Sequence, residues 1–209
     1  MSKKPCSVLF LGKEKDGHAA SAAEFCRLNF KSVSVHLGRW GDPLPAGIGL
    51  SAWDCIISYL SRWIVSEDLL RQAKFAINFH PGPPEYPGYG CNNFAIYEEA
   101  RDYGVCCHHM APRVDTGAII AVKRFPVLSN DNAGTLLARA YDYQLVLFYE
   151  VVARLVRGEE LPVSREKWTR KPFTRRQFDE LGRITADMTK DEVARRTRAT
   201  NVGALKPAG

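Results

Sequence analysis

The sequence lacks any apolar run that approaches the roughly 20 residues needed for a membrane-spanning helix. Its start, MSKKPCSVLFLG, has two lysines and a short apolar run. That run is too short for the apolar region of a secretory signal, and no small-residue cleavage site follows it. We therefore interpret residues 7–12 as a first buried strand, and we expect neither secretion nor a membrane partner.

The sequence also lacks a CxxC pair, although it contains six cysteines. Four of these lie inside apolar runs, which predicts free buried thiols in a reducing, cytoplasmic setting. Adjacent residues of the CCHH run at 106–109 point to opposite faces of a strand, so these four side chains cannot gather around one zinc ion. We therefore expect no metal site.

Negative charge is in the minority. The chain has 29 lysines and arginines against 23 aspartates and glutamates, which gives a net charge of +6. Much of the excess lies in one short segment: Arg165, Lys167, Arg170, Lys171, Arg175 and Arg176. Such a segment is typical of a solvated surface, but it would also attract a polyanion such as a nucleotide pyrophosphate or an RNA.

The rest of the composition suits a globular domain with a substantial core, since 45% of the 209 residues are hydrophobic and no repeat occurs. Ser66 is expected to cap a helix. The predicted elements of the first half are strands at 7–12, 32–37, 53–60 and 75–79 and helices at 19–28 and 66–74. This alternation predicts an α/β, Rossmann-like fold with a mostly parallel central sheet flanked by helices.

The second half of the chain begins with a loop rich in proline and glycine. The elements predicted after it are a helix at 93–102, strands at 105–110 and 118–125, and a long helix at 133–157. Asn130 or Asp131 is expected to cap the long helix, and Gly158 to end it.

The composition changes near residue 160. From residue 164 the sequence becomes basic and less periodic, and Thr189-x-x-Glu192 fits a capping box that opens one last helix. We therefore divide the chain into a main domain, residues 1–160, and a basic extension, residues 161–209. For the extension we expect a role in dimerisation or in contacting a nucleotide.

The strand that ends in INFH delivers Asn78 and His80, and the loop PGPPEYPGYG follows at once. Ligands of open α/β sheets bind beyond the carboxyl ends of the strands. Residues two apart in a strand share a face, and Pro81 favours an extended His80, so both side chains can project into one crevice. Their N–H groups suit a carbonyl oxygen that becomes negative in a tetrahedral intermediate. A polar pair satisfied by loop backbone is the alternative.

Asp115 lies in the stretch GVCCHHMAPRVDTG, in the turn between two predicted strands. Asp and Gly are ordinary turn residues, so a turn-forming role is one interpretation. The other is a carboxylate that accepts or relays a proton beside His80.

Asn-x-His-Pro after a strand, then Gly-x-x-x-His and a downstream Asp-x-Gly, resembles the folate-dependent formyltransferases. This family includes glycinamide ribonucleotide formyltransferase, methionyl-tRNA formyltransferase and the sugar N-formyltransferases. The resemblance runs from about residue 53 to residue 127 and implies that the domain at 1–160 is a formyltransferase catalytic domain. It implies that Asn78, His80 and Asp115 are catalytic, with His108 orienting Asp115 or tuning its charge.

The resemblance also implies N10-formyltetrahydrofolate as the formyl donor. Its pterin would lie between the segment SRWIVS and the loop before Asp115, against Trp63, Ile64, Val65, Ala111, Arg113 and Val114. Ile64 and Val65 could equally be core residues.

Three stretches are most similar to the sugar N-formyltransferases: HPGPPEYPGYGCNNFAIYE, CCHHM and WTRKPFTRRQ. This implies formylation of a nucleotide-linked aminodeoxy sugar, such as dTDP-4-amino-4,6-dideoxyglucose or a 3-amino relative, for surface-glycan (O-antigen) biosynthesis. Tyr86, Tyr89 and Asn93 are candidates to line the sugar, and basic residues near Trp168 to reach the nucleotide, with loop or surface packing as the alternative for each. We expect a cytoplasmic homodimer without a nucleic-acid partner.

Three alternatives stay open. Glycinamide ribonucleotide enzymes carry a Gly/Ser-rich phosphate loop after the first strand, where this chain has the charged turn KEKD. The tRNA enzymes carry a C-terminal β-barrel, for which the residues after 160 are too few, although the basic segment keeps RNA binding open. A folate-binding relative that lost catalysis is the third.

Overall fold

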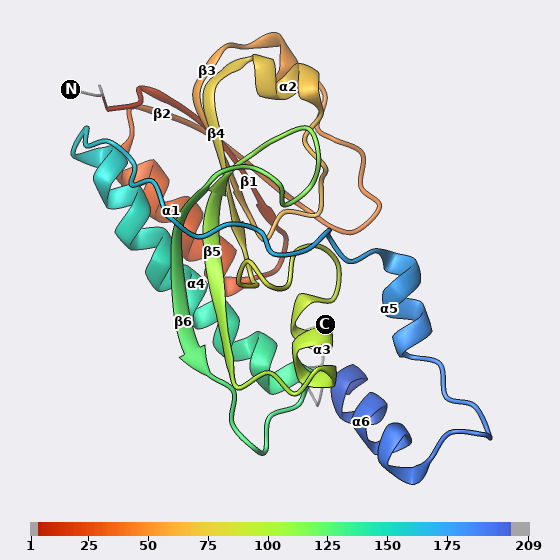
Figure 1. Ribbon diagram of the computed structural model, residues 1–209. Helices are drawn as coiled ribbons and strands as arrows, with labels where there is room; N and C mark the ends of the chain where they lie inside the picture. Colours follow the sequence, from red (N-terminus) through yellow and green to blue (C-terminus); the bar gives the residue numbers. More distant parts are fainter. Residues whose placement is uncertain (1–3, 202–209) are drawn as a thin grey trace.

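A six-stranded sheet forms the centre of the fold in the computed structural model, which describes residues 4–201. Figure 1 shows its arrangement. The strands are β1 (Ser7–Lys13), β2 (Ser32–Gly38), β3 (Trp53–Tyr59), β4 (Ala73–His80), β5 (Asp102–His109) and β6 (Ile119–Pro126). The helices are α1 (Gly17–Asn29), the single turn η1 (Ile48–Leu50), α2 (Glu67–Arg71), α3 (Cys91–Tyr97), α4 (Ala133–Val156), α5 (Arg175–Leu181) and α6 (Lys190–Thr200).

The strands follow the order β2-β1-β3-β4-β5-β6. β2, β1, β3 and β4 pair in parallel, whereas β5 runs antiparallel to both β4 and β6. The mostly parallel α/β sheet predicted from the sequence is confirmed. The antiparallel β5 sets its last residues beside the end of β4, with Asn78 opposite His108 and His80 opposite Cys106.

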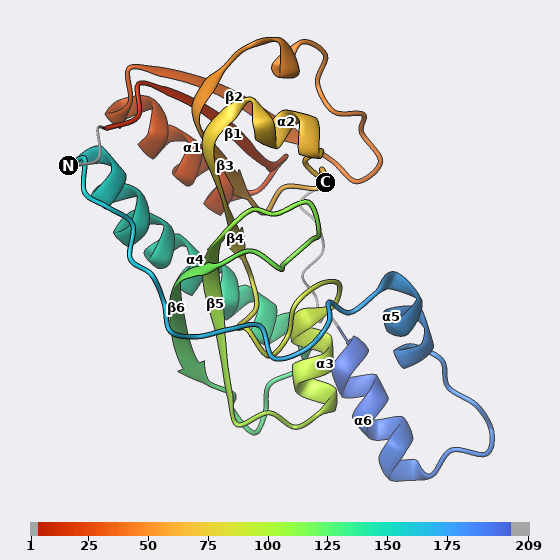
Figure 2. The same ribbon diagram turned by 45° about the horizontal axis from the view of Figure 1, so that its top comes forward.

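Both faces of the sheet are covered, which explains the continuous apolar runs of its inner strands. Val8 and Phe10 on β1 belong to the large core shared with α1 and α4, and the intervening Leu9 and Leu11 belong to a smaller core shared with η1 and α2. α1 and α4 lie side by side on one face of the sheet (Figures 1 and 2). Alternation along one strand therefore supplies two cores.

Several element boundaries differ from the sequence predictions. Ser66 caps α2 as predicted, since its side chain accepts from the Leu69 N–H, but α2 ends at Arg71 because the chain enters β4 at Ala73. The helix predicted at 93–102 is α3, which starts at residue 91 and ends at residue 97, since residue 102 already pairs in β5.

The predicted cap of the long helix is wrong. Asn132, not Asn130 or Asp131, caps α4, and its side chain accepts hydrogen bonds from the N–H groups of Gly134 and Thr135. Asp131 binds Arg139 and accepts from the Leu128 N–H instead. Gly158 directly follows the C-cap and has the positive φ of +69° that ends many helices.

The residues after 160 return along the sheet and then form α5 and α6, of which α6 lies beside α3 (Figure 1). Helix α5 was not predicted, although Thr174 and Gln177 form a complete capping box that its sequence TRRQ could have indicated. At α6, Thr189 accepts from the Glu192 N–H, which confirms the predicted cap. The Glu192 side chain binds Arg195 and Arg196 instead of completing a box.

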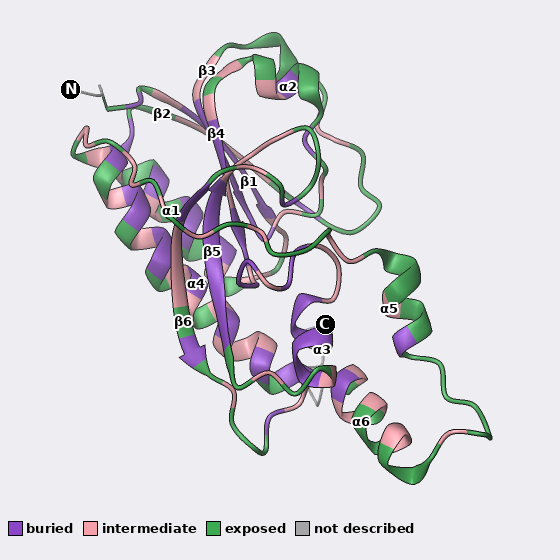
Figure 3. Ribbon diagram, viewed as in Figure 1, coloured by how far each residue is buried: buried purple, intermediate pink, exposed green. Residues whose placement is uncertain are grey.

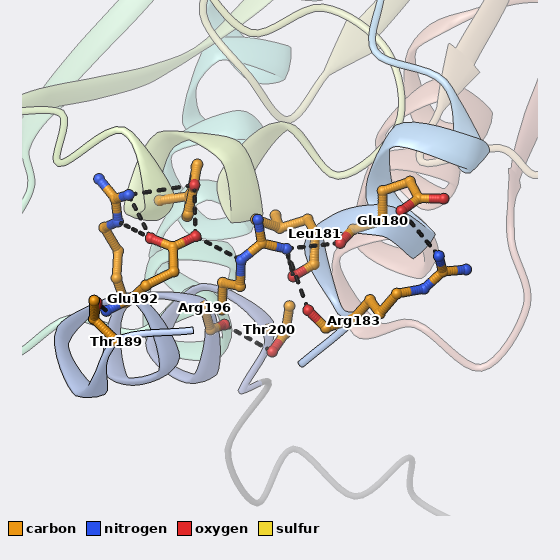
Figure 4. A network of polar contacts seen from close by, with 9 residues as sticks. Glu180, Leu181, Arg183, Thr189, Glu192, Arg196 and Thr200 are labelled. Atoms are coloured by element: carbon orange, nitrogen blue, oxygen red, sulfur yellow. Dashed lines mark hydrogen bonds and ion pairs between the residues drawn. The ribbon is translucent and has the colours of Figure 1, made fainter. Parts of the chain in front are cut away.

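Helix α6 contacts its neighbours through hydrogen bonds from Arg196 and through a buried residue near its C-terminal end. Arg196 donates to the carbonyl oxygens of Glu180, Leu181 and Arg183, with distances of 2.8, 3.3 and 3.3 Å. Figure 4 draws this network. Ala199, near the end of α6, is fully buried against the main core. Figure 3 accordingly shows buried positions on α3 and mostly exposed ones on α5.

All six cysteines carry free thiols, and every one except Cys6 is buried, as the sequence predicted for most of them. Across residues 4–201, no helix combines the length and the apolar character needed to cross a membrane.

Candidate active site

Four polar side chains meet where β4 ends: Asn78, His80, His108 and Asp115. Asp115 lies between the two histidines, with its Oδ2 atom 3.3 Å from His80 Nδ1 and its Oδ1 atom 3.2 Å from His108 Nε2. The Asn78 amide nitrogen lies 3.1 Å from His108 Nε2. The structure thus brings together all four residues that the sequence predicted as catalytic or supporting.

Local backbone structure explains this convergence. Asn78 and His108 are direct neighbours across the β4–β5 pair, so the sheet register fixes their contact. Asp115 folds back from the β5–β6 loop with φ of +48°, a left-handed conformation that Asp tolerates better than most residues. The loop closes tightly at Gly117, where a Cβ atom would stand 1.7 Å from the His109 carbonyl oxygen.

Both ring nitrogens of His80 face an acceptor. Nε2 lies 2.9 Å from the Tyr86 carbonyl oxygen, and a carbonyl can only accept, so Nε2 carries a hydrogen. Nδ1 faces Asp115, which favours a hydrogen there too. Burial would lower the pKa of His80, but the Asp115 charge, Cys91 and the Tyr86 carbonyl raise it to about 9. His80 is therefore an imidazolium at neutral pH.

Asp115 is the matching anion. Burial opposes its ionisation, yet the His80 charge, the hydrogen bond from His108 and the Gly88 N–H hold the pKa of this carboxyl well below its usual value. The Gly88 N–H donates to Oδ2 at 2.8 Å. Asp115 is thus a carboxylate whose Oδ2 atom accepts from the Gly88 N–H and faces His80, while its Oδ1 atom faces His108, at a site that is almost fully buried.

The orientation of His108 is set by the backbone. Its Nδ1 atom lies 2.8 Å from the His109 carbonyl oxygen and must therefore donate to it. Its Nε2 atom then faces both the Asn78 amide and Asp115.

The proline- and glycine-rich loop wraps the cluster with backbone atoms. Tyr86 contributes its carbonyl to His80, and Gly88 contributes its N–H to Asp115. Gly82 permits this close approach, because a Cβ atom there would stand 2.6 Å from His80 Nε2. The loop therefore acts as a wall that contacts the two ionised groups directly.

Sequence reasoning left Trp168 out of the site. Its ring meets those of His80 and His108 edge to face, with centroid separations of 6.0 and 5.1 Å, and its Nε1–H donates to the Gly117 carbonyl at 2.7 Å. Trp168 therefore covers both histidines from a segment more than 50 residues away in the chain. Its position in an aperiodic basic stretch carries no signal of this contact.

The residues predicted to hold the pterin lie in different settings. Trp63 packs on Gly38 and donates from Nε1 to the Asp42 and Pro43 carbonyls, and Val65 is buried in the smaller core. Ile64 is 75% exposed. Ala111 is half-buried and follows Met110, which packs on the smaller core. Arg113 and Val114 are exposed on the loop before Asp115.

The residues predicted to line the sugar are partly engaged elsewhere. Tyr86 is buried, with its ring between those of Tyr103 and Phe173. Tyr89 contacts the Phe178 ring and the Arg175 guanidinium. The Asn93 amide is buried and donates to the Ala199 carbonyl at 2.7 Å, so the structure gives it a partner on α6 instead of joining it to the His80 cluster.

The described part of the chain contains no group of three or more His, Cys, Asp or Glu side chains arranged to hold a metal ion. A cation, a carboxylate and an amide held within hydrogen-bond reach can stabilise a developing oxyanion and move a proton.

Comparison with known proteins gives this geometry a family context. Residues 53–152 match the family model described as formyl transferase. A curated methionyl-tRNA formyltransferase of Levilactobacillus brevis is 29% identical over 116 residues, which are 54% of this chain and 37% of the relative. The matched part of the chain therefore spans little more than a third of that relative's length.

Solved structures show the same fold. A sugar N-formyltransferase from a Shewanella species superposes with a TM-score of 0.76 at 20% identity, covering 97% of this chain and 91% of its own. The N-formyltransferase from Helicobacter canadensis, in complex with folinic acid and dTDP-3-aminofucose, gives a TM-score of 0.70 at 20% identity, covering 92% of this chain and 79% of its own.

Proposed function

We propose that the protein transfers a formyl group from N10-formyltetrahydrofolate to the amine of a nucleotide-linked aminodeoxy sugar, and the match of residues 53–152 to the formyl transferase family model supports this proposal. One observation carries the proposal: Asn78, His80 and His108 converge on Asp115 at the carboxyl end of β4. A similar fold binds folinic acid and dTDP-3-aminofucose in the Helicobacter canadensis protein, which supports the choice of both substrates.

His80 acts in this mechanism as a donor and not as a base. With a pKa of about 9 it is already protonated at neutral pH, so it cannot take the proton of the attacking amine. Its Nε2–H, which donates to the Tyr86 carbonyl here, would donate to the formyl oxygen when the donor binds. The Asn78 amide supplies the second hydrogen bond to the oxyanion.

Asp115 is then the group left to accept the proton. The amine nitrogen attacks the formyl carbon, and the bond from that carbon to N10 breaks. One amine proton passes to Asp115, directly or through a water, and from there to N10, so that charge and atoms balance. His108 keeps the carboxylate oriented through its Nε2 contact.

We place the pterin between the segment of Trp63, Ile64 and Val65 and the loop at Ala111. Trp63 and Val65 form a packed surface there, and the exposed Ile64 is free to contact a ligand. Of the three residues predicted to line the sugar, Tyr86 and Asn93 are buried and Tyr89 is half-buried. Tyr89 is therefore the candidate to contact the sugar. A role in surface-glycan biosynthesis and a homodimeric assembly in the cytoplasm complete the proposal.

The curated relatives keep a second acceptor in view. The Levilactobacillus brevis relative is a methionyl-tRNA formyltransferase, so methionyl-tRNA is the second candidate acceptor. Both acceptors use the same donor chemistry, and a direct comparison of acceptors separates them.

The test follows the absorbance change as N10-formyltetrahydrofolate becomes tetrahydrofolate. Purified protein is assayed with dTDP-linked 3-amino and 4-amino sugars, with methionyl-tRNA and without an acceptor. We expect turnover only with an amino sugar nucleotide. Turnover with the tRNA alone would select the second candidate, and formate release without any amine would instead indicate a hydrolase.

Variants connect the activity to the cluster. We expect Asn78→Ala and His80→Gln each to slow turnover by about a hundredfold or more, because each removes a donor to the oxyanion. His36→Ala, on the edge strand β2, is the matched histidine control and should keep full activity. Near-normal turnover of both site variants, with native thermal stability, would contradict the assignment.

A further inference from the structure

A groove of about 570 Å³ borders the candidate active site. One wall is the loop that carries Asp115, and the other is the segment that leads into α5. Its lining residues are Arg113, Val114, Thr116, Trp168, Thr169, Arg170, Lys171 and Pro172. The Trp168 Nε1–H bond to the Gly117 carbonyl ties the two walls together.

The groove is positively charged. Its lining has three cationic side chains and no acidic one among the described residues. Arg170 is neutralised by Glu98, with nitrogen to oxygen distances of 2.7 and 3.1 Å, and lies over the Tyr86 and Phe173 rings. Arg113 and Lys171 form no ion pair within residues 4–201, so both are available to an anion.

Trp168 connects the groove to the chemistry. The same indole that lines the groove contacts both His80 and His108. An anion between Arg113 and Lys171 would therefore be separated from the cluster by the width of one side chain. A ligand with a charged part in the groove and a reactive group beyond Trp168 fits this arrangement.

The two sides of the Asp115 loop suit two substrates. On one side Met110 packs on the smaller core with Val65, where the pterin is proposed to lie. On the other side Arg113, Val114 and Thr116 face the groove. Formyl transfer needs the acceptor amine to reach a formyl carbon that is still attached to the bound donor, so the two substrates need separate sites that meet at the cluster. With the pterin on the Met110 side, the groove is left for the acceptor.

We propose that this groove binds the diphosphate of the acceptor, with Arg113 and Lys171 as its charged contacts and Trp168 as the wall between diphosphate and amine. The assignment rests on the proposed function. It moves Arg113 and Val114 from the folate, where the family resemblance set them, to the acceptor. A diphosphate carries the charge that two unpaired cations require, and a neutral sugar does not.

Binding measurements test the groove without any turnover. Isothermal titration of the full chain with dTDP and with inorganic pyrophosphate should show binding that weakens as salt is added, because the contacts are exposed charges. Lys171→Ala and Arg113→Ala should each weaken dTDP binding by about tenfold. Lys167→Ala removes an exposed cation of the same segment that does not line the groove, and it should bind as the unaltered chain does.

Tetrahydrofolate titration is the second arm. Unchanged folate affinity in the Lys171 and Arg113 variants is expected. Weakened folate binding with unchanged dTDP binding would overturn the proposal, since the groove would then hold the folate carboxylates. Absence of dTDP and pyrophosphate binding would overturn it as well. Lys171-dependent dTDP binding without formyl transfer would keep the groove and remove the proposed function.

Discussion

At the scale of single residues, the decisive feature is the ion pair of opposite charges formed by His80 and Asp115. Each group is buried, and burial alone would favour the neutral form of both. Their contact reverses this, so that the pKa of His80 rises to about 9 and the pKa of Asp115 falls well below its usual value. The pair is therefore ionised throughout the neutral range and is ready to donate to an oxyanion.

This charge predicts how activity depends on pH. We expect kcat/KM to fall as pH rises through about 9, where His80 loses the proton that makes it a strong donor. Initial rates of formyl transfer, measured in one buffer series from about pH 6 to about pH 10, give the pH dependence of kcat/KM. A rate that keeps rising through that range would instead assign His80 as the base.

The free energy of unfolding should depend on the same two groups, with His80 limiting it at high pH and Asp115 at low pH. The contribution of His80 is complete below its ordinary pKa of 6.5 and is lost as pH rises through about 9. The contribution of Asp115 is present above its ordinary pKa of 3.8 and is lost only in stronger acid, as pH falls through its depressed pKa. Urea unfolding of the unaltered chain and of His80→Gln isolates the alkaline loss, which the variant should lack. Equal losses in the two proteins would count against the ion pair.

At the scale of elements, the loop at residues 81–90 is held from two sides. Gly88 donates to Asp115 on one side and forms a β-bridge with Phe173 on the other. In this bridge the Phe173 N–H donates to the Pro87 carbonyl, and the Phe173 carbonyl accepts from the Tyr89 N–H. Gly88 has φ of +86°, and a Cβ atom there would stand 2.4 Å from the Phe173 carbonyl oxygen. Only glycine fits this position without moving one of the two segments.

We therefore expect Gly88→Ala to lower the free energy of unfolding by about 2 kcal/mol or more, through the left-handed backbone and the overlap. Formyl transfer should fall with it, since the Asp115 contact shifts. Gly17→Ala is the control, because its Cβ atom meets open space at the start of α1. That change should stabilise the chain by up to about 1 kcal/mol. Denaturant unfolding that ranks the two variants equally would argue against this account.

At the scale of the whole molecule, residues after 160 contribute directly to the site and to the core. Phe173 stacks on Phe94 with ring centroids 3.8 Å apart, Leu181 is buried, and Ala199 holds the Asn93 amide. Trp168 covers the two histidines. The sequence division at residue 160 thus crosses many buried contacts.

Removing residues 161–209 should consequently lower the melting temperature by roughly 5 °C or more and abolish formyl transfer. Trp168→Ala in the full chain separates the two effects, since it opens the cover of the histidines and leaves Phe173, α5 and α6 in place. It should lose most activity while melting close to the unaltered chain. A shortened chain that melts and turns over normally would show that residues 1–160 are a self-sufficient unit.

The sequence alone determined the strands of the sheet and the pair of polar side chains, Asn78 and His80, at the carboxyl end of β4. Continuous apolar runs and a period of two predict the strands, and the same period sets Asn78 and His80 on one face. Their spacing to His108 and Asp115 then indicated a formyltransferase. These features are local, because each depends on residues a few positions apart or on a motif of known spacing.

Only the tertiary structure decided what surrounds those four residues. The Tyr86 carbonyl, the Gly88 N–H and the Trp168 ring reach the cluster from a loop and from a segment far along the chain. Asn93 was expected at the sugar but is bound by Ala199, 106 positions away. Backbone groups carry no sequence signal, and contacts between distant segments follow from how the elements pack. Packing therefore decided which groups donate and which cations remain free for a ligand.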